Sequence, residues 1–388
     1  MNTSCIKILG LLALTSWVLV ACKDDDKPTG NADDLTQIPY APQDYVIVKP
    51  AKFPEVPIPA DNPMTVEGVQ LGRRLFYDPI LSGDSTQSCA SCHLPAGNFT
   101  DNKKVSTGID GIDGRRSSMA LLNIAYVTNG LFWDGRSKNL EDQALRPVED
   151  PIEMHNTWTN VISKLRNHPD YPARFRKAFG ITSKQQITKE LAAKAIAQFE
   201  RIMISSGQSK FDAFDYGANL GALDEDELEG YIMFNDDAQN WGVALPDAQC
   251  FHCHGGFTLT GNNYFNNGLD SVVSLDDFTD KGRFEATGNN SDKGKFRAPT
   301  LRNIALSAPY MHDGRFATLE QVLDHYSGNG KGVSNEDPFI KQVGFPIPGT
   351  NPVQYTGLTL KQKKAIVKFL NTLTDTTFIN NPDILNPF

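Results

Sequence analysis

The chain has only 6 Cys and 7 His among 388 residues, and its apolar residues almost never alternate with polar ones as they do in strands. No apolar run reaches the ~20 residues that a membrane-spanning helix needs. The formal net charge of −9 makes the protein a poor binder of nucleic acid, although an acidic surface can steer a basic protein toward it. These shortages disfavour a sheet protein, a membrane-spanning protein and a nucleic-acid binder.

The few cysteines are concentrated in two motifs, Cys89-Ala90-Ser91-Cys92-His93 and Cys250-Phe251-His252-Cys253-His254. In a C-x-x-C-H motif the two thiols add to the vinyl groups of a haem, and the histidine is an axial ligand of the iron. The alternative is a zinc site, whose C-x-x-C pairs usually stand about 15–20 residues apart. Here residues 93–249 separate the pairs. The motifs therefore predict a c-type cytochrome with two haems.

The N-terminus predicts export. Lys7 precedes a short apolar run that ends in Leu19-Val20-Ala21-Cys22, which resembles a lipoprotein signal peptidase site. Residues 1–21 would be the signal peptide and Cys22 the lipid anchor; ordinary cleavage with Cys22 as a free thiol is the alternative. Lys23-Asp24-Asp25-Asp26 looks like a signal for the outer face of the outer membrane. We expect a protein anchored at the periplasmic or outer face of the outer membrane of a Gram-negative bacterium.

The rest of the chain divides into a tether and two domains. Residues 22–62 carry seven prolines among polar residues, which suits an extended tether. Compact structure is expected to start near Thr65, with an N-terminal domain over 63–215 and a C-terminal domain over 216–388. A weak repeat supports a duplication. Its pairs are Leu122-Asn123-Ile124-Ala125 with Arg302-Asn303-Ile304-Ala305, Trp133-Asp134-Gly135-Arg136 with His312-Asp313-Gly314-Arg315, and Leu140-Glu141 with Leu319-Glu320.

Helical patterns dominate both halves. Apolar spacing predicts helices over Val66–Tyr77, Lys189–Ile204 and Thr359–Leu373. Polar, glycine-rich loops are expected over Ser106–Arg115 and Asn262–Asn290. We therefore expect a mainly α fold with two cytochrome c-like domains, each built around a covalently bound haem c.

Longer motifs resemble the bacterial dihaem cytochrome c peroxidase and MauG family over about residues 65–375. In the first half they are Leu71-Gly72-Arg73-Arg74-Leu75-Phe76-Tyr77-Asp78, Phe132-Trp133-Asp134-Gly135-Arg136, Leu140-Glu141-Asp142-Gln143 and Asp150-Pro151-Ile152-Glu153-Met154. In the second half they are Ala298-Pro299-Thr300-Leu301-Arg302-Asn303 and Ala308-Pro309-Tyr310-Met311-His312-Asp313-Gly314.

The resemblance implies a division of labour between the haems. Peroxide would react at the N-terminal haem, with His93 as proximal ligand, while the C-terminal haem, held by His254, relays or stores oxidising equivalents. Glu153 matches the catalytic glutamate and Gln143 its neighbouring glutamine. Trp133 matches the tryptophan between the haems; its alternative role is that of a core aromatic. The expected partners are hydrogen peroxide and a small cytochrome c or another redox donor, and a homodimer is also expected.

The resemblance further implies a calcium ion between the domains, bound by an asparagine side chain and two carbonyl groups. The carbonyls match Ser307 and Pro309, but the asparagine position falls on Ser117. A serine hydroxyl is a weaker ligand for this cation than an amide carbonyl.

Two departures from the classical pattern bear on the chemistry. Classical members carry a histidine that caps the peroxidatic iron, but Ser106–Arg115 contains none, so the first haem should be active as isolated, as in MauG-like proteins. The methionine that is the sixth ligand of the second haem in classical members falls on Tyr326, with His325 as the competing ligand and Met311 as a distant third. Of the other histidines, His155, His168 and His252 are expected to be structural or surface residues.

Three functions follow from these residues. The first is a peroxidase that draws electrons through the C-terminal haem. The second is a MauG-like oxidase that uses peroxide equivalents to oxidise a protein or organic substrate. The third is a surface electron-transfer cytochrome without peroxide chemistry.

Overall fold

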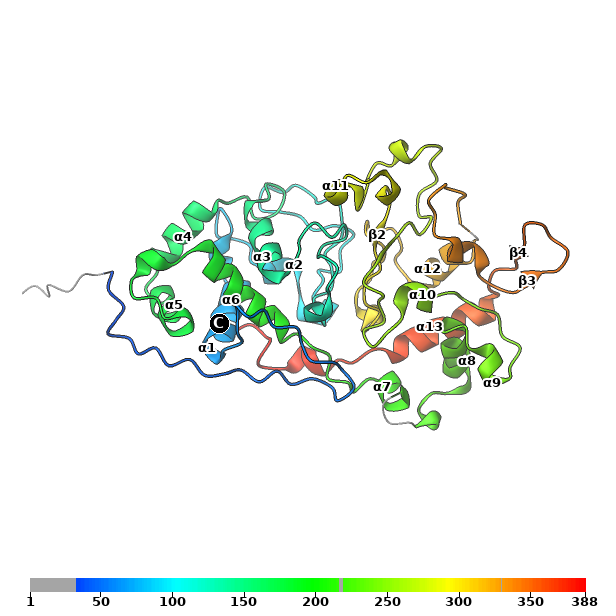
Figure 1. Ribbon diagram of the computed structural model, residues 1–388, viewed down its shortest axis with the longest axis horizontal. Helices are drawn as coiled ribbons and strands as arrows, with labels where there is room; N and C mark the ends of the chain where they lie inside the picture. The colour runs from blue at the N-terminus through cyan, green and yellow to red at the C-terminus, as the bar shows by residue number, and fades with distance from the viewer. Residues whose placement is uncertain (1–32, 216–218, 329) are drawn as a thin grey trace, which may run out of the picture.

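The computed structural model describes residues 33–215, 219–328 and 330–388. Helices α1 to α6 lie at one end of an elongated molecule and helices α7 to α13 at the other (Figure 1). The strands in the described residues form two short antiparallel pairs, β1 (Tyr264–Phe265) with β2 (Phe296–Arg297) and β3 (Pro346–Ile347) with β4 (Gln354–Tyr355). The expectation of a mainly α protein is confirmed.

The N-terminal half is organised around the packing of α1 on α6. Its helices are α1 (Val66–Tyr77), α2 (Cys89–Cys92), α3 (Leu140–Glu149), α4 (Trp158–Asn167), α5 (Tyr171–Phe179) and α6 (Lys189–Arg201). Thr65 caps α1 by accepting a hydrogen bond from the Gly68 amide at 3.0 Å. Gly72 lies so close to α6 that an added Cβ would stand 1.8 Å from the Ala195 carbonyl oxygen. Only glycine allows this approach of the two helices.

The C-terminal half repeats this arrangement with α8 on α13. Its helices are α7 (Lys210–Asp215), α8 (Glu225–Phe234), α9 (Ala238–Trp241), α10 (Phe251–His254), α11 (Phe284–Thr287), α12 (Leu319–Tyr326) and α13 (Leu360–Thr372). Gly230 of α8 lies against α13, where an added Cβ would stand 2.2 Å from the Ala365 carbonyl oxygen. The same close helix contact therefore recurs in both halves.

Matched local conformations also recur at the repeated motifs. Asn123 and Asn303 both adopt left-handed backbone conformations, with φ of 66° and 60°, and each begins a short 3-10 turn. An isolated bridge joins Leu131 to Ser137 in the first half, and its counterpart joins Tyr310 to Phe316 in the second. Helix α3 follows the first bridge as α12 follows the second.

Helix boundaries agree closely with the expected ones, with two exceptions. Helix α1 spans Val66–Tyr77 as predicted, and Thr359 caps α13. Helix α6 ends at Arg201, short of the predicted Ile204. Helix α11 is a short turn inside the expected loop Asn262–Asn290, where it brings Glu285 toward the other half.

The segment expected to be an extended tether packs against the rest of the protein over its described part. Residues 33–64 run extended along the N-terminal half as far as the junction of the halves and then turn back toward α1 (Figure 1). The Phe53 side chain is buried, with its ring 5.7 Å from that of Tyr126 and 4.9 Å from that of Phe257, and the Arg302 guanidinium lies over it. The proline content correctly indicated an extended chain, but single apolar residues between the prolines anchor it.

Two further segments tie the halves together. Phe211 and Phe214 of α7 pack in the core of the C-terminal half, although the sequence placed them in the first domain. The C-terminal tail returns to α1 (Figure 1), where the Tyr77 hydroxyl donates to the Ile384 carbonyl at 2.7 Å. Both contacts cross the boundary that we expected at residue 215.

Within the described ranges, no helix combines the length and the apolar character needed to cross a membrane. Cys22 and the predicted signal peptide lie outside the described residues.

Candidate active site

A cavity of about 500 Å³ opens beside the first C-x-x-C-H motif. This volume lies in the range of small-molecule and cofactor sites. All the residues predicted for the first haem and for peroxide chemistry line it: Cys89, Cys92, His93, Trp133, Gln143 and Glu153. They come from α2, from α3 and from the loops on either side of α3.

His93 is held in the orientation that a metal ligand needs. Its Nδ1 lies 2.7 Å from the carbonyl oxygen of Phe99. Since a carbonyl can only accept, Nδ1 carries the proton and Nε2 keeps its lone pair. Burial lowers the pKa of His93, which favours the neutral imidazole. Cys89 and Cys92 are free cysteines.

Glu153 lies on the loop after α3, and it is half-buried. Desolvation, together with the charge of Asp150, raises the pKa of its carboxyl to about 7, against the lowering effect of Arg136. A carboxyl with a pKa near neutrality can accept a proton and then return it. Gln143 and Pro147 project from α3 into the same cavity, one turn apart.

Trp133 lies where the two halves meet. Its indole Nε1 donates to the Ser117 carbonyl at 2.9 Å, and its own carbonyl accepts from the Arg297 amide of the second half at 2.8 Å. Its side chain lines both the 500 Å³ cavity and a smaller cavity of about 100 Å³ toward the second half.

Glu200 of α6 is a cavity residue that the sequence did not reveal. It is 4% exposed, and its Oε2 has no hydrogen-bond partner. Desolvation raises its pKa to about 8, against the lowering effect of Arg201. An acid within the apolar pattern of α6 was the available signal, but that pattern predicts only an amphipathic helix.

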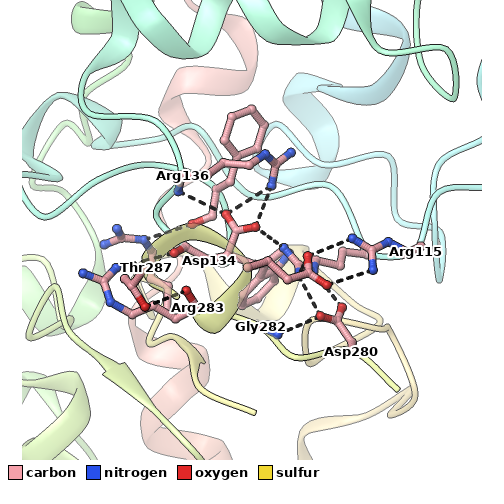
Figure 2. Close-up of polar contacts among 12 residues, drawn as sticks. Arg115, Asp134, Arg136, Asp280, Gly282, Arg283 and Thr287 are labelled. Atoms are coloured by element: carbon pink, nitrogen blue, oxygen red, sulfur yellow. Dashed lines mark hydrogen bonds and ion pairs between the residues drawn. The ribbon is translucent and has the colours of Figure 1, made fainter. Parts of the chain in front are cut away.

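An ion-pair network that the sequence did not predict includes four residues that line the cavity: Arg115, Arg116, Asp134 and Glu285. Arg116 pairs with Asp134 at 2.6 Å and with both carboxylate oxygens of Asp280 at 2.7 Å. Arg115 makes a bidentate pair with Glu285 at 3.1 and 2.9 Å. Figure 2 shows how these side chains converge from the two halves. Asp280 and Glu285 thus bring the second half onto the loop beside the first motif.

The second motif has a similar histidine. His254 Nδ1 lies 3.1 Å from the Pro299 carbonyl oxygen, and burial lowers its pKa to about 4. Asn267 lies close to three residues that we weighed as the sixth ligand. Its side-chain amide is 3.3 Å from the Tyr326 hydroxyl and 3.4 Å from the Met311 sulfur, while its backbone carbonyl is 2.9 Å from His325 Nε2.

The three histidines that we expected to be structural or surface residues have partners of their own. His155 pairs with Asp110, His168 packs on the Tyr171 ring, and His252 stacks on Phe339 with 3.6 Å between ring centres.

The small cavity at the junction gathers the predicted calcium residues Ser117, Ser307 and Pro309. No carboxylate is among the residues that line it, and the Arg297 guanidinium adds a positive charge. The Ser117 hydroxyl donates to the Met311 carbonyl at 3.1 Å. Only neutral oxygens could hold a cation here, so calcium stays a prediction and no step below depends on it.

Comparison with known proteins identifies the family. The model of the di-haem cytochrome c peroxidase family matches residues 66–219. The cytochrome c551 peroxidase of Nitrosomonas europaea is 37% identical over 277 residues, which cover 71% of this chain and 78% of that protein. The chain belongs to the dihaem cytochrome c peroxidase and MauG family. Membership makes it an oxidoreductase of the cytochrome c peroxidase class.

Both branches of the family are among its relatives. MauG of Methylorubrum extorquens is 33% identical over 84% of this chain and 87% of its own. The crystal structure of a MauG-like protein associated with microbial copper homeostasis superposes with a TM-score of 0.75 at 33% identity, over 87% of this chain and 98% of the other. The fold of the dihaem peroxidase BthA from Burkholderia thailandensis is also similar, with a TM-score of 0.63 at 22% identity.

The residues present fit two haems of this family. Each motif offers two free thiols and a histidine whose Nδ1 lies against a carbonyl, and the first motif faces a cavity of suitable size. Cys89, Cys92 and His93 would hold one haem, and Cys250, Cys253 and His254 the other.

Proposed function

We propose that this protein is a dihaem c-type peroxidase that reduces hydrogen peroxide at the N-terminal site with electrons relayed through the C-terminal site. The observation that carries the proposal is the convergence of Glu153 and Gln143 on the cavity that His93 and its two cysteines line. The covalently bound haems, when present, supply the iron redox chemistry. The recurring turns and helix contacts support an origin of the two domains by duplication.

Glu153 would move the proton that peroxide cleavage requires. Reduction of H₂O₂ to two waters consumes two electrons and two protons. One proton must also pass from one peroxide oxygen to the other, which leaves as water. A carboxyl with a pKa near 7 can take that proton as a base and deliver it as an acid. The amide of Gln143, which projects from α3 into the same cavity, would orient the peroxide by hydrogen bonding without adding charge.

Trp133 would connect the two sites. Its ring borders both cavities, and its backbone is bonded to Arg297 across the junction of the halves. An oxidisable aromatic ring at this place shortens the gap over which an electron must travel. The export signal and the lipid anchor at Cys22 would bring the enzyme to the membrane surface, where a small cytochrome c could dock.

The loop Ser106–Arg115, which lacks the capping histidine of classical members, is held by contacts on several sides. This supports activity without prior reduction. Gly108 packs against the Ile152 carbonyl, and the Ile109 amide donates to the Glu153 carbonyl at 3.0 Å. Asp110 pairs with His155 and Arg115 with Glu285. These contacts hold the loop beside Glu153, so the site needs no rearrangement to accept peroxide.

Replacing Glu285 by glutamine should loosen this loop. The change weakens the pairs with Arg115 and Arg116, and a partly exposed pair is worth roughly 0.5–1 kcal/mol. Hydrogen exchange of residues 106–116 should become about 2- to 5-fold faster, while exchange elsewhere stays unchanged. Glu320→Gln, an exposed acid at the start of α12, is the control. Equal exchange in both variants and the wild type would mean that the network does not hold the loop.

Steady-state turnover with reduced cytochrome c tests the function. Rapid, peroxide-dependent oxidation of the cytochrome supports the peroxidase. A long-lived oxidised enzyme without donor turnover supports the second candidate, a MauG-like oxidase that acts on a protein or organic substrate. Tyr326 at the second site favours that candidate, because a phenolate ligand stabilises oxidised iron. No reaction with peroxide would leave an electron-transfer protein.

A further inference from the structure

Asn267 contacts both members of the adjacent pair His325 and Tyr326. Its two functional groups point to different partners. The backbone carbonyl meets His325 Nε2 at 2.9 Å, and the side-chain amide meets the Tyr326 hydroxyl oxygen at 3.3 Å. Asn267 belongs to the loop that follows β1, whereas the pair ends α12. This contact therefore joins segments that are distant in the sequence.

The carbonyl contact occupies Nε2 of His325. A carbonyl oxygen only accepts, so His325 Nε2 must carry a proton and donate it. The protonated Nε2 has no lone pair for a metal, so the neutral ring keeps a lone pair only on Nδ1, and the hydrogen bond fixes the direction of the ring.

The amide contact acts on Tyr326. An Asn NH₂ group has two hydrogens, so it can donate one to the Tyr326 oxygen and one to the Met311 sulfur, 3.4 Å away. A hydrogen bond to a phenol oxygen stabilises its anionic form and withdraws electron density from it. Hydrogen bonds of this kind tune the strength of an axial ligand and hence the potential of the metal.

We propose that Asn267 is a positioning residue that selects Tyr326 over His325 as the sixth ligand of the C-terminal haem and raises the potential of that haem by donating a hydrogen bond to the ligand oxygen. The proposal rests on the proposed function, because it requires tyrosine ligation at the second haem. Asn267 would thus keep His325 from binding the iron and would also adjust how strongly the Tyr326 oxygen donates to it.

The test is the holoprotein of Asn267→Ala, which removes the amide and leaves the carbonyl in place. The phenolate-to-iron charge-transfer band should remain but move to longer wavelength, and the midpoint potential of the C-terminal haem should become more negative. No bis-histidine signature should appear, since the carbonyl still holds His325. Asn263→Ala, an exposed amide on the same segment, is the matched control and should leave both values unchanged. The spectrum of the N-terminal haem reports whether a variant is still folded.

The possible failures are distinguishable. A wild-type spectrum without any phenolate band would refute tyrosine ligation and with it this part of the proposed function. A wild-type band that is unchanged in Asn267→Ala, with an unchanged potential, would overturn the role of Asn267 alone. A bis-histidine spectrum in Asn267→Ala would show that the side chain, and not the carbonyl, keeps His325 away. If Asn267→Ala lost the N-terminal haem signal as well, Asn267→Ser would replace it, with the same shifts expected at smaller size.

Discussion

Glutamine in place of Glu153 should reduce peroxide turnover by about 100- to 10,000-fold, the usual contribution of a positioned general acid and base. Glutamine has nearly the same shape, but it can neither take a proton from peroxide nor return one. Haem content and melting temperature should be unchanged, because the Glu153 carboxyl forms no salt bridge with any residue that the structure describes. Glu149→Gln, at the exposed end of α3, is the control and should keep wild-type turnover.

The pH dependence follows from the same carboxyl. Because the first step needs the deprotonated form and burial raises the pKa of Glu153 to about 7, kcat/KM should rise with pH through about 7 and then level off. This ionisation should be missing from the residual activity of Glu153→Gln. A variant that retained wild-type turnover, or that kept the same pH profile, would remove Glu153 from the mechanism.

Phenylalanine in place of Tyr326 should abolish the phenolate signature of the C-terminal haem in the near-infrared and resonance Raman spectra. The midpoint potential of that haem should also rise markedly, because an anionic oxygen ligand stabilises ferric iron. His325 should not replace the tyrosine, since its Nε2 is bonded to the Asn267 carbonyl. Met311 shares the Asn267 amide with Tyr326 and is the nearer substitute.

The matched control for this variant is Tyr231→Phe, which removes a phenol from α8 that is partly buried against the core of the C-terminal half. Its spectrum should equal that of the wild type. Identical spectra for Tyr326→Phe and the wild type would show that the tyrosine is not a ligand.

Local sequence patterns predicted most of the helical framework. Helix α1 begins at the residue after Thr65 and ends where its apolar spacing ends, because capping and amphipathic period are local properties. The two C-x-x-C-H motifs are also local, since the cysteines and the histidine must lie on one short turn. Residues matched through the family motifs, such as Gln143 and Glu153, did meet in one cavity.

Contacts between distant segments could not be predicted in this way. The pairing of Arg115 with Glu285 joins residues 170 positions apart, and the approach of Asn267 to Tyr326 joins residues 59 positions apart. The spacing of apolar residues along the chain does not indicate contacts between such distant segments. The packing of Phe53 was missed for a related reason: proline-rich composition predicts an extended backbone but does not report which side chains the folded body will bury.

The central claim is that the N-terminal site is preformed and reacts with peroxide in the fully oxidised enzyme. Stopped-flow mixing of the oxidised holoprotein with hydrogen peroxide, without any reductant, tests it most directly. The account predicts an immediate change in the Soret band, with a rate proportional to peroxide concentration and equal to that of enzyme pre-reduced by one electron and mixed in the same way. An oxidised enzyme that stays inert until one electron has been added would contradict it.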